Sequence, residues 1–401
     1  MIESALRALL QGVVREGALD VRLPNGRVLR LGEAHLDRQP APVTVAVTSW
    51  PWLGRIIIAP ALAVGEAYAE GAFVIERGGL DAFMALATRN LHYLTKPAYV
   101  PRNDRLRARR NVARHYDLPS DLYTLFLDPD RQYSCAYFES PDVTLAAAQE
   151  AKKRHIAMKL NLSRGMDVLD IGSGWGGMAL TLAKHYGARV TGITLSQEQL
   201  HVARRRAQEH GLEACVGFHL CDYRDAAGVF DRIVSVGMFE HVGVQDYANF
   251  FDLLSRRLKP DGVALLHTIG CSGPPQANNP WIERYIFPGG YIPSLSQIAA
   301  AVERSGLIIA DVEVLRLHYA ETIKAWRANF AARQAEAARL LDDRFRRMWN
   351  FYLAGAESGF RHGRLEVFQL QLIKSQAALP ITRDYMLQDE QRRELSLAAA
   401  E

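Results

Sequence analysis

From about residue 145 onward, short apolar runs alternate with longer amphipathic stretches. The apolar runs have the length of strands and lie at 167–171, 189–194, 216–221, 230–236 and 262–268. Helical stretches accompany them at about 145–162, 177–185, 197–210 and 247–258. Strands that alternate with helices in this way are typical of βαβ units. The pattern therefore predicts an α/β fold with a doubly wound sheet.

The end of the chain departs from that alternation. Residues 307–314 have the pattern of a strand, and at 368–372 apolar residues alternate with two glutamines, which predicts a final strand. Two helices, at about 320–339 and 342–356, are inserted between these strands. We expect the final strand to be antiparallel. Beyond it, residues 381–401 form a polar tail.

Residues 1–95 predict a smaller α+β domain. Residues 20–31 have the pattern of a hairpin with Asn25-Gly26 at its turn, and valines alternate with Thr and Ala at 43–47 as in a half-buried strand. The pattern at 64–90 predicts short helices separated by Gly71 and by Gly78-Gly79. We expect this domain to serve dimerisation or lipid docking.

Residues 96–118 form a basic linker or helix between this domain and a catalytic domain at 119–380. A net positive charge over 102–114 comes from Arg102, Arg105, Arg107, Arg109, Arg110 and Arg114, opposed by Asp104. Such a run is either a solvated linker or a contact with an anionic surface. Residues 271–293, which are rich in Gly, Pro and aromatic residues, are expected to form a lid.

Composition limits the other possibilities. The 401 residues are 49% hydrophobic and 23% charged, with a formal net charge of +4, which is only mildly basic and does not require nucleic acid as a partner. The four cysteines form no C-x-x-C pair, as expected of free thiols in a reducing compartment. The longest apolar stretch, at about 56–64, is far shorter than the ~20 residues of a membrane span. We therefore expect a cytoplasmic protein with at most peripheral membrane contact.

A strand runs directly into glycines at 168–177, Val-Leu-Asp-Ile-Gly-Ser-Gly-Trp-Gly-Gly. Gly172 permits a tight turn, and Gly174 allows the backbone to approach a ligand. Such a loop can also be a simple turn with no ligand. Asp170, however, lies at the strand end, where its carboxylate can accept a hydrogen bond from the amino group of a zwitterionic ligand. The second strand ends at 192–196 without the acid that NAD-binding folds place there, which favours S-adenosylmethionine (SAM) over NAD.

Asp222-Tyr223 follows the third strand, at the edge of the sheet where ligands bind. Asp222 could accept a hydrogen bond from an adenine amino group. Taken alone, an acid at this position is more often part of a surface turn.

The chain resembles the cyclopropane-fatty-acyl-phospholipid synthase family and the related mycolic acid cyclopropane synthases. The resemblance covers about 100–375, and the matching strings are at 115–118, 132–138, 170–177, 192–196, 238–243, 267–270, 281–282, 285–288 and 318–319. It implies a Rossmann-like SAM-dependent methyltransferase fold. It also implies that SAM is bound by Tyr133, Ser134, Asp170, Gly172, Ser173, Gly174, Thr194, Gln199, Asp222 and Tyr223. For the nearby Tyr137 and Phe138, packing in the core is the favoured interpretation.

The resemblance further implies a reaction in which a methylene group is added across the cis double bond of an unsaturated phospholipid acyl chain. In this family a bound bicarbonate ion serves as the base. The positions that hold it correspond to Cys135, Glu240, His267, Ile269 and Tyr319, and all five carry the expected residue. No metal is expected, because the sequence has no H-E-x-x-H helix.

Three alternatives to cyclopropane formation remain. A close relative could transfer a methyl group to the same lipid alkene and give a methyl-branched or methylene product, which the bicarbonate set would also serve. A lipid-binding protein without activity is disfavoured by the complete set of bicarbonate residues. A small-molecule methyltransferase fits the lid and the acyl-type motifs less well. For the synthase, the implied partners are membrane phospholipid, contacted through the arginine run, and a second copy of the chain in a homodimer.

Overall fold

The computed structural model describes residues 14–32, 42–91 and 120–387, which fall into two compact units. The first unit comprises 14–32, 42–91, 276–288 and 320–365 within that range. The second comprises 120–275, 289–319 and 366–387. Neither unit is continuous in sequence. The arginine run at 102–114 lies outside the described residues.

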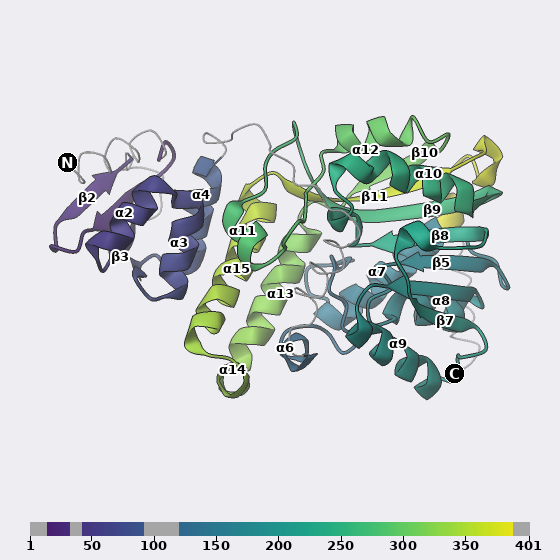
Figure 1. The fold of residues 1–401 in the computed structure, drawn as a ribbon, viewed down its shortest axis with the longest axis horizontal. Coiled ribbons are helices and arrows are strands. Elements are labelled where there is room, and N and C mark those ends of the chain that lie inside the picture. The colour runs from purple at the N-terminus through teal and green to yellow at the C-terminus, as the bar shows by residue number, and fades with distance from the viewer. Residues whose placement is uncertain (1–13, 33–41, 92–119, 388–401) are drawn as a thin grey trace. The chain divides into compact units, whose positions relative to one another are not determined.

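The first unit has a four-stranded sheet with the order β2-β1-β3-β4 (Figure 1). β1 (Leu19–Arg22) and β2 (Val28–Leu31) form the predicted hairpin, and Gly26 in its turn has a φ of 84°. β3 (Val43–Val47) confirms the predicted strand and pairs parallel to β1, but only Ala46 is not fully buried, so the strand is not half-buried as predicted. β4 (Phe73–Arg77) pairs antiparallel to β3.

β4 corrects the prediction that 64–90 contains only helices. The segment is too short for its periodicity to separate a strand from a helical turn, and its pairing with β3 decides the outcome. Two helices, α3 (Pro60–Ala69) and α4 (Gly79–Leu91), flank it as predicted. A further helix, α2 (Trp50–Ile58), was not predicted.

Residues from the later part of the chain complete the first unit. They form α11 (Pro280–Tyr285), most of α13 (His318–Ala332), α14 (Gln334–Leu340) and α15 (Asp343–His362). Ala354 of α15 belongs to the same buried cluster as Val45 and Phe73. The predicted boundary, which assigned 271–293 and 320–356 to the catalytic domain, therefore differs from the compact units. Packing of apolar side chains, which sequence order does not reveal, causes this difference.

The second unit has a seven-stranded sheet with the order β10-β11-β9-β8-β5-β6-β7. Its strands are β5 (Asp167–Ile171), β6 (Arg189–Thr194), β7 (Val216–Leu220), β8 (Phe230–Val236), β9 (Leu258–Cys271), β10 (Ile308–Val314) and β11 (Leu365–Ile373). Strands β5 to β9 pair in parallel, whereas β11 pairs antiparallel to β10. The α/β fold class and the antiparallel last strand are confirmed.

Helices cover both faces of this sheet (Figure 1). Val168 joins one buried cluster with residues of α7 (Leu145–Lys159), α8 (Gly177–Tyr186) and α9 (Gln197–Glu209). The next residue, Leu169, joins a different cluster with α10 (Tyr247–Arg257) and α12 (Leu295–Val302). Successive strand residues face opposite sides, so the apolar run of β5 is buried on both. One further short helix, α6 (Ser120–Thr124), precedes α7.

The start of the predicted polar tail is held by specific contacts. Arg383 forms an ion pair of 2.5 Å with Asp311 of β10. The Gln371 amide of β11 donates a hydrogen bond of 2.8 Å to the Tyr385 hydroxyl. Residues up to 387 therefore belong to the second unit, and the rest of the tail lies outside the described residues.

Gly65 tests how tightly the first unit is packed. A Cβ atom at this position would lie 2.5–2.7 Å from the indole ring of Trp281, which is only 3% exposed. We expect Gly65→Ala to lower the free energy of unfolding by about 1–3 kcal/mol, measured by denaturant titration. The matched control is Gly54→Ala in α2, where a Cβ would meet no atom within 4 Å. The control should be neutral or stabilising, because alanine favours a helix over glycine. Equal effects of the two substitutions would contradict the packing argument.

Candidate functional site

A cavity lies within the second unit at the carboxyl ends of β5, β6, β7 and β8. Ligands bind at this edge of open α/β sheets, because the loops that follow the parallel strands meet there. A segment preceding α7 completes the wall. All ten residues predicted to bind SAM line this one cavity: Tyr133, Ser134, Asp170, Gly172, Ser173, Gly174, Thr194, Gln199, Asp222 and Tyr223.

The glycine loop is fixed to the neighbouring strand and open towards the cavity. The N–H groups of Gly172 and Ser173 both donate to the Ile193 carbonyl of β6, at 2.9 and 3.0 Å. Gly172 has a φ of 82°, and a Cβ there would lie 2.8 Å from Met238. Gly174 has a φ of 54°, and a Cβ there would meet no atom within 4 Å. The loop thus leaves space for a ligand beside Gly174.

Asp170 supplies an unsatisfied acceptor at the cavity. The side chain is only 1% exposed, and its Oδ2 has no hydrogen-bond partner among the described residues. Burial raises the pKa of this carboxyl to about 7, and the positive charge of Lys152 partly opposes the increase. A buried acceptor without a partner is costly, and the amino group of a bound ligand would satisfy it. The residue therefore fits a ligand that carries an ammonium group.

The second strand contributes a short polar chain to the cavity. Thr194 Oγ1 donates to Gln199 Oε1 at 2.9 Å, and the Gln199 N–H donates to Ser196 Oγ at 3.2 Å. Ser196 is thereby the N-cap of α9, which places Gln199 in the first turn. The three side chains are buried, so this arrangement is held rigidly at the cavity wall.

Asp222 is already engaged by a protein partner. Its carboxylate accepts from Arg224 Nε and Nη2, both at 2.8 Å, and from the Arg224 N–H at 3.0 Å. The neighbouring Tyr223 ring is buried against Phe250 in an edge-on contact of 5.4 Å. Asp222 itself lines the cavity. Arg224 also lines the cavity and was not predicted.

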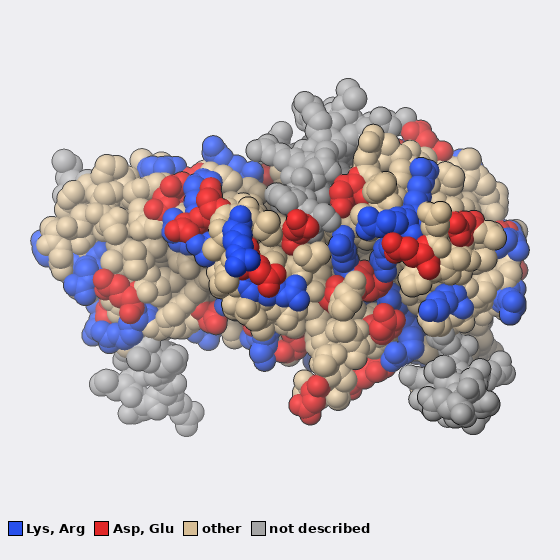
Figure 2. Space-filling view, turned by 90° about the horizontal axis from the view of Figure 1, so that it is seen from below, with Lys and Arg blue, Asp and Glu red and all other residues tan. Residues whose placement is uncertain are grey.

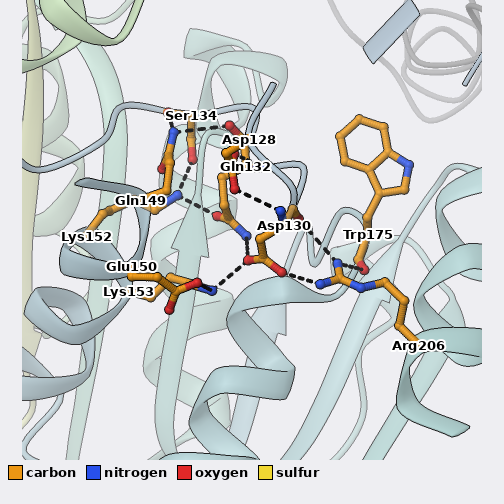
Figure 3. A network of polar contacts seen from close by, with 10 residues as sticks. All are labelled: Asp128, Asp130, Gln132, Ser134, Gln149, Glu150, Lys152, Lys153, Trp175 and Arg206. Carbon is orange, nitrogen blue, oxygen red and sulfur yellow. Dashed lines mark hydrogen bonds and ion pairs between the residues drawn. The ribbon is translucent and has the colours of Figure 1, made fainter. Parts of the chain in front are cut away.

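A polar network supports the wall segment 128–134 and was missed by the sequence analysis (Figure 3). Asp128 turns the segment by accepting from the N–H groups of Asp130 and Gln132, both at 2.9 Å. Asp130 pairs with Lys153 of α7 at 2.7 Å and with Arg206 of α9. Arg206 also donates to the Trp175 carbonyl at 2.9 Å. The segment is thus fixed to two helices and to the glycine loop.

The sequence gives no sign that two members of this network, both in α7, differ from the polar residues of an ordinary surface helix. Gln149 and Lys152 of α7 are fully buried, and the Gln149 amide donates to the Ser134 carbonyl at 3.0 Å. They lie three residues apart, so they share a helix face. Polar residues in a surface helix show the same spacing. Only their burial distinguishes them.

Glu240 is a second buried acid, close to but separate from the cavity lining. It lies in the 3-10 turn η3 (Phe239–His241), and its Oε1 accepts from the Ile269 N–H at 2.6 Å. Its Oε2 is buried and accepts no hydrogen bond from the described residues, and the nearby Thr268 hydroxyl donates to the Ile269 carbonyl at 3.0 Å. Burial raises the pKa of Glu240 to about 7.

The structure joins two of the five predicted bicarbonate residues directly, Glu240 and Ile269. His267 lies two residues before Ile269 on β9, and a hydrogen bond of 3.1 Å joins its Nδ1 to the Gln369 amide of β11. Burial lowers the pKa of His267 well below its usual value, so the ring is neutral. Cys135 and Tyr319 are also buried. Among the described residues, the cavity lining includes none of these five.

The structure gives no group of three or more His, Cys, Asp or Glu side chains suited to a metal ion, as far as the described ranges extend. His241, next to Glu240, lines the cavity, and burial lowers its pKa to about 4. The ring is therefore neutral at physiological pH.

The doubly wound sheet, the antiparallel last strand and the glycine-loop cavity define a SAM-dependent transferase of the methyltransferase fold. Two solved cyclopropane synthases share this fold. MmaA2 from Mycobacterium tuberculosis has a TM-score of 0.62 and 34% identity over 66% of this chain and 97% of its own. CmaA1, solved with SAH and CTAB, has the same TM-score and identity over 68% of this chain and 99% of its own.

Sequence comparison identifies the family. The family model described as mycolic acid cyclopropane synthetase matches residues 103–370, and the chain belongs to this family. The cyclopropane-fatty-acyl-phospholipid synthase of Escherichia coli K12 is 37% identical over 88% of this chain and 94% of its own. A probable fatty acid methyltransferase of Pseudomonas putida is 37% identical over 87% and 93%, respectively. The tuberculostearic acid methyltransferase UfaA1 of M. tuberculosis is 40% identical over 72% of each chain.

The raised pKa of Asp170 makes the folded protein less stable as pH rises. Between its unfolded pKa, near 3.8, and about 7, the folded state keeps a proton that the unfolded state releases. We expect Asp170→Asn to increase the free energy of unfolding by about 1–4 kcal/mol at pH 8 and by less at pH 4. Denaturant titration at both pH values measures this difference.

Asp167→Asn is the matched control for this prediction. Asp167 begins the same strand, but its side chain is 38% exposed and pairs with Arg189. The control should change stability by less than about 1 kcal/mol at either pH. A loss of stability at pH 8 in Asp170→Asn would show that the carboxylate is compensated in the fold.

Proposed function

We propose that this protein transfers a methylene group from SAM to the cis double bond of an unsaturated phospholipid acyl chain and forms a cyclopropane ring. The observation that carries the proposal is the similarity to the E. coli synthase, which extends over 88% of this chain. The cavity supports it, because the ten residues expected to bind SAM converge there.

The residues of the cavity suit a cationic, zwitterionic ligand. SAM, when bound, supplies a methyl group attached to a positively charged sulfur. Asp170 would accept from its amino group, and the Tyr133 ring would face its positive charge. Rings of Tyr123 and Phe126 contact Tyr133 edge-on at 5.6 and 5.8 Å and so fix its orientation.

The chemistry at the lipid requires an anion and the exclusion of water. One alkene carbon forms a bond to the transferred methyl carbon, the carbon–sulfur bond breaks, and the other alkene carbon becomes cationic. Loss of a proton from the new methyl group lets its electron pair close the ring. Water would trap such a cation, so a dry site with buried acceptors favours ring closure.

Glu240 is the residue of this chain best suited to accept that proton from the base. Its Oε2 is buried and its pKa lies near 7, so the carboxyl can change protonation state at neutral pH. Bicarbonate, when bound, would supply the base. Its proposed holders remain Cys135, Glu240, His267, Ile269 and Tyr319. The Ile269 N–H donates to Glu240 in this structure, so Glu240 would share or release that donor when an anion binds.

A second candidate function is C-methylation of the same lipid alkene. Two relatives favour it: the P. putida protein is a probable fatty acid methyltransferase, and UfaA1 is a tuberculostearic acid methyltransferase. Both reactions begin with methyl transfer and lose a proton from the cation. They differ in whether a ring or a methylated chain results.

Mass analysis of acyl chains separates the two functions. The protein is incubated with SAM and vesicles of unsaturated phospholipid. The masses of the recovered acyl chains are then measured before and after hydrogenation. A gain of one CH₂ that takes up no hydrogen identifies the ring. A gain that still takes up hydrogen identifies a methylated alkene. Chains of unchanged mass would contradict both functions.

We expect Glu240→Gln to lower turnover by about 10²-fold or more, because it removes an ionisable acceptor at the reacting centre. Binding of S-adenosylhomocysteine, measured by calorimetry, should stay within about threefold of wild type. In the wild type, turnover should fall as pH drops below about 7, where Glu240 becomes protonated. The exposed Glu303→Gln is the control and should leave both quantities unchanged. Loss of ligand affinity in Glu240→Gln would place the residue in the SAM site instead.

The proposed substrate also requires contact with a membrane. Within the described ranges, no helix combines the length and the apolar character needed to span a bilayer. On the face drawn in Figure 2, acidic and basic side chains are interspersed and form no broad basic surface. We propose, from its net positive charge, that the arginine run at 102–114 contacts anionic head groups at the inner face of the membrane. We also propose that the protein acts as a homodimer.

Charge reversal tests the proposed contact. Replacement of Arg107, Arg109 and Arg110 by Glu should reduce sedimentation with anionic vesicles by about tenfold or more at low salt. Binding to neutral vesicles serves as the reference. Unchanged sedimentation with anionic vesicles would rule out this surface.

A further inference from the structure

Lys152 is a buried cation directly behind the cavity wall. It lies in α7, is 0% exposed, and its Nζ donates to Gln132 Oε1 at 2.5 Å and to Ser134 Oγ at 2.8 Å (Figure 3). Both partners line the cavity, whereas Lys152 does not. A buried ammonium is costly unless it is compensated, so its presence here needs a physical reason.

Titratable groups from several elements surround this ammonium. Asp128 and Asp130 of the wall segment attract it, and so does Cys135 if ionised. Lys153 of α7 repels the ammonium, and the ammonium in turn disfavours the protonated form of His267 on β9. The remaining group is Asp170 at the end of β5, on which the Lys152 charge acts across the wall. Lys152 is the only charged group among the described residues that stabilises the ionised form of Asp170.

We propose that Lys152 is a positioning residue of the SAM site. Its ammonium holds Gln132 and Ser134 in the cavity wall through two hydrogen bonds, and its positive charge favours the ionised form of Asp170, which the amino group of the ligand would contact. The inference rests on SAM as the ligand, not on the lipid product. Lys152 does not line the cavity, so it would act on the ligand through Gln132, Ser134 and Asp170.

The two roles of Lys152 predict a particular dependence of binding on pH. Burial raises the pKa of Asp170 to about 7, and ligand binding favours the ionised form, so affinity rises with pH through about 7 and then levels off. Burial also lowers the pKa of Lys152 to about 8, so its charge supports Asp170 below that pH and fades above it. Without the charge, Asp170 ionises only at higher pH.

The test is calorimetric binding of S-adenosylhomocysteine between pH 5.5 and 9 to the full-length protein. Lys152→Gln keeps an amide that can donate to Ser134 but removes the charge. We expect about tenfold lower affinity at pH 6.5 and a smaller difference at pH 9, with the pH midpoint of binding moved upward. Lys152→Met removes the hydrogen bonds as well and should also lower affinity at pH 9. Titration of the ligand's own groups is the same in every variant, so shifts between variants belong to the protein.

Two further variants make the test specific. Asp170→Asn removes the titrating carboxylate, so its binding should be weak and should lose the rise through pH 7. Arg154→Gln is the matched control, because Arg154 is a basic residue of the same helix that pairs with Glu139 at the surface. It should leave affinity and midpoint unchanged. Thermal melts of each variant test whether the fold is retained, and if Lys152→Gln does not fold, Lys152→Met takes its place, with the same upward shift of the midpoint expected. Lys152→Arg keeps the charge and should keep the midpoint.

Two outcomes would overturn the inference: a Lys152→Gln midpoint equal to that of wild type, or an affinity within twofold at all pH values. These results do not depend on turnover. If the pH pattern appears but vesicle lipids gain no mass, the proposed function fails while the role of Lys152 stands. If lipids are modified and the midpoint does not move, only the role of Lys152 fails.

Discussion

The Asp130 carboxylate is the contact on which the wall of the proposed SAM site depends. Its two oxygens accept from Lys153 of α7, Arg206 of α9 and the Gln132 side chain, so one residue joins two helices to the wall of the cavity. It also explains a glycine. A Cβ at Gly177, the first residue of α8, would lie 2.4 Å from Asp130 Oδ2. The wall, the glycine loop and the helices behind them are thus joined at one carboxylate, which a side chain at position 177 would displace.

Around this contact, the second unit buries charge where a stable core would bury apolar groups. Asp170, Glu240 and Lys152 each have a pKa moved towards the neutral form, which means that the folded state disfavours their charges. The surrounding sheet, buried on both faces, is rigid enough to hold them. Of the three, only Asp170 lines the cavity, and a ligand that carries an ammonium group would satisfy its buried Oδ2.

Much of the second unit could be predicted because its strands are buried on both faces and are flanked by regular helices. The predicted bounds of β5, β6 and β8 match the structure residue for residue. The ten cavity residues were placed by motif and resemblance. By contrast, β4, the wall network and the place of α11 in the first unit depend on contacts between residues far apart in sequence. Lys152 and an exposed basic residue such as Arg154 look alike in a sequence, and only the packing of α7 separates them.

The discontinuous first unit has a consequence for synthesis. Its sheet is complete once residue 77 has been made, yet Ala354 of its buried cluster and the ion pair of Arg327 with Asp81 arrive near the end of translation. Until then, the apolar faces of α3 and α4 have no α15 to cover them, because these helices pack on it directly. The first unit therefore cannot complete its core until most of the chain has been made, and apolar surface of its earliest segments stays uncovered during elongation.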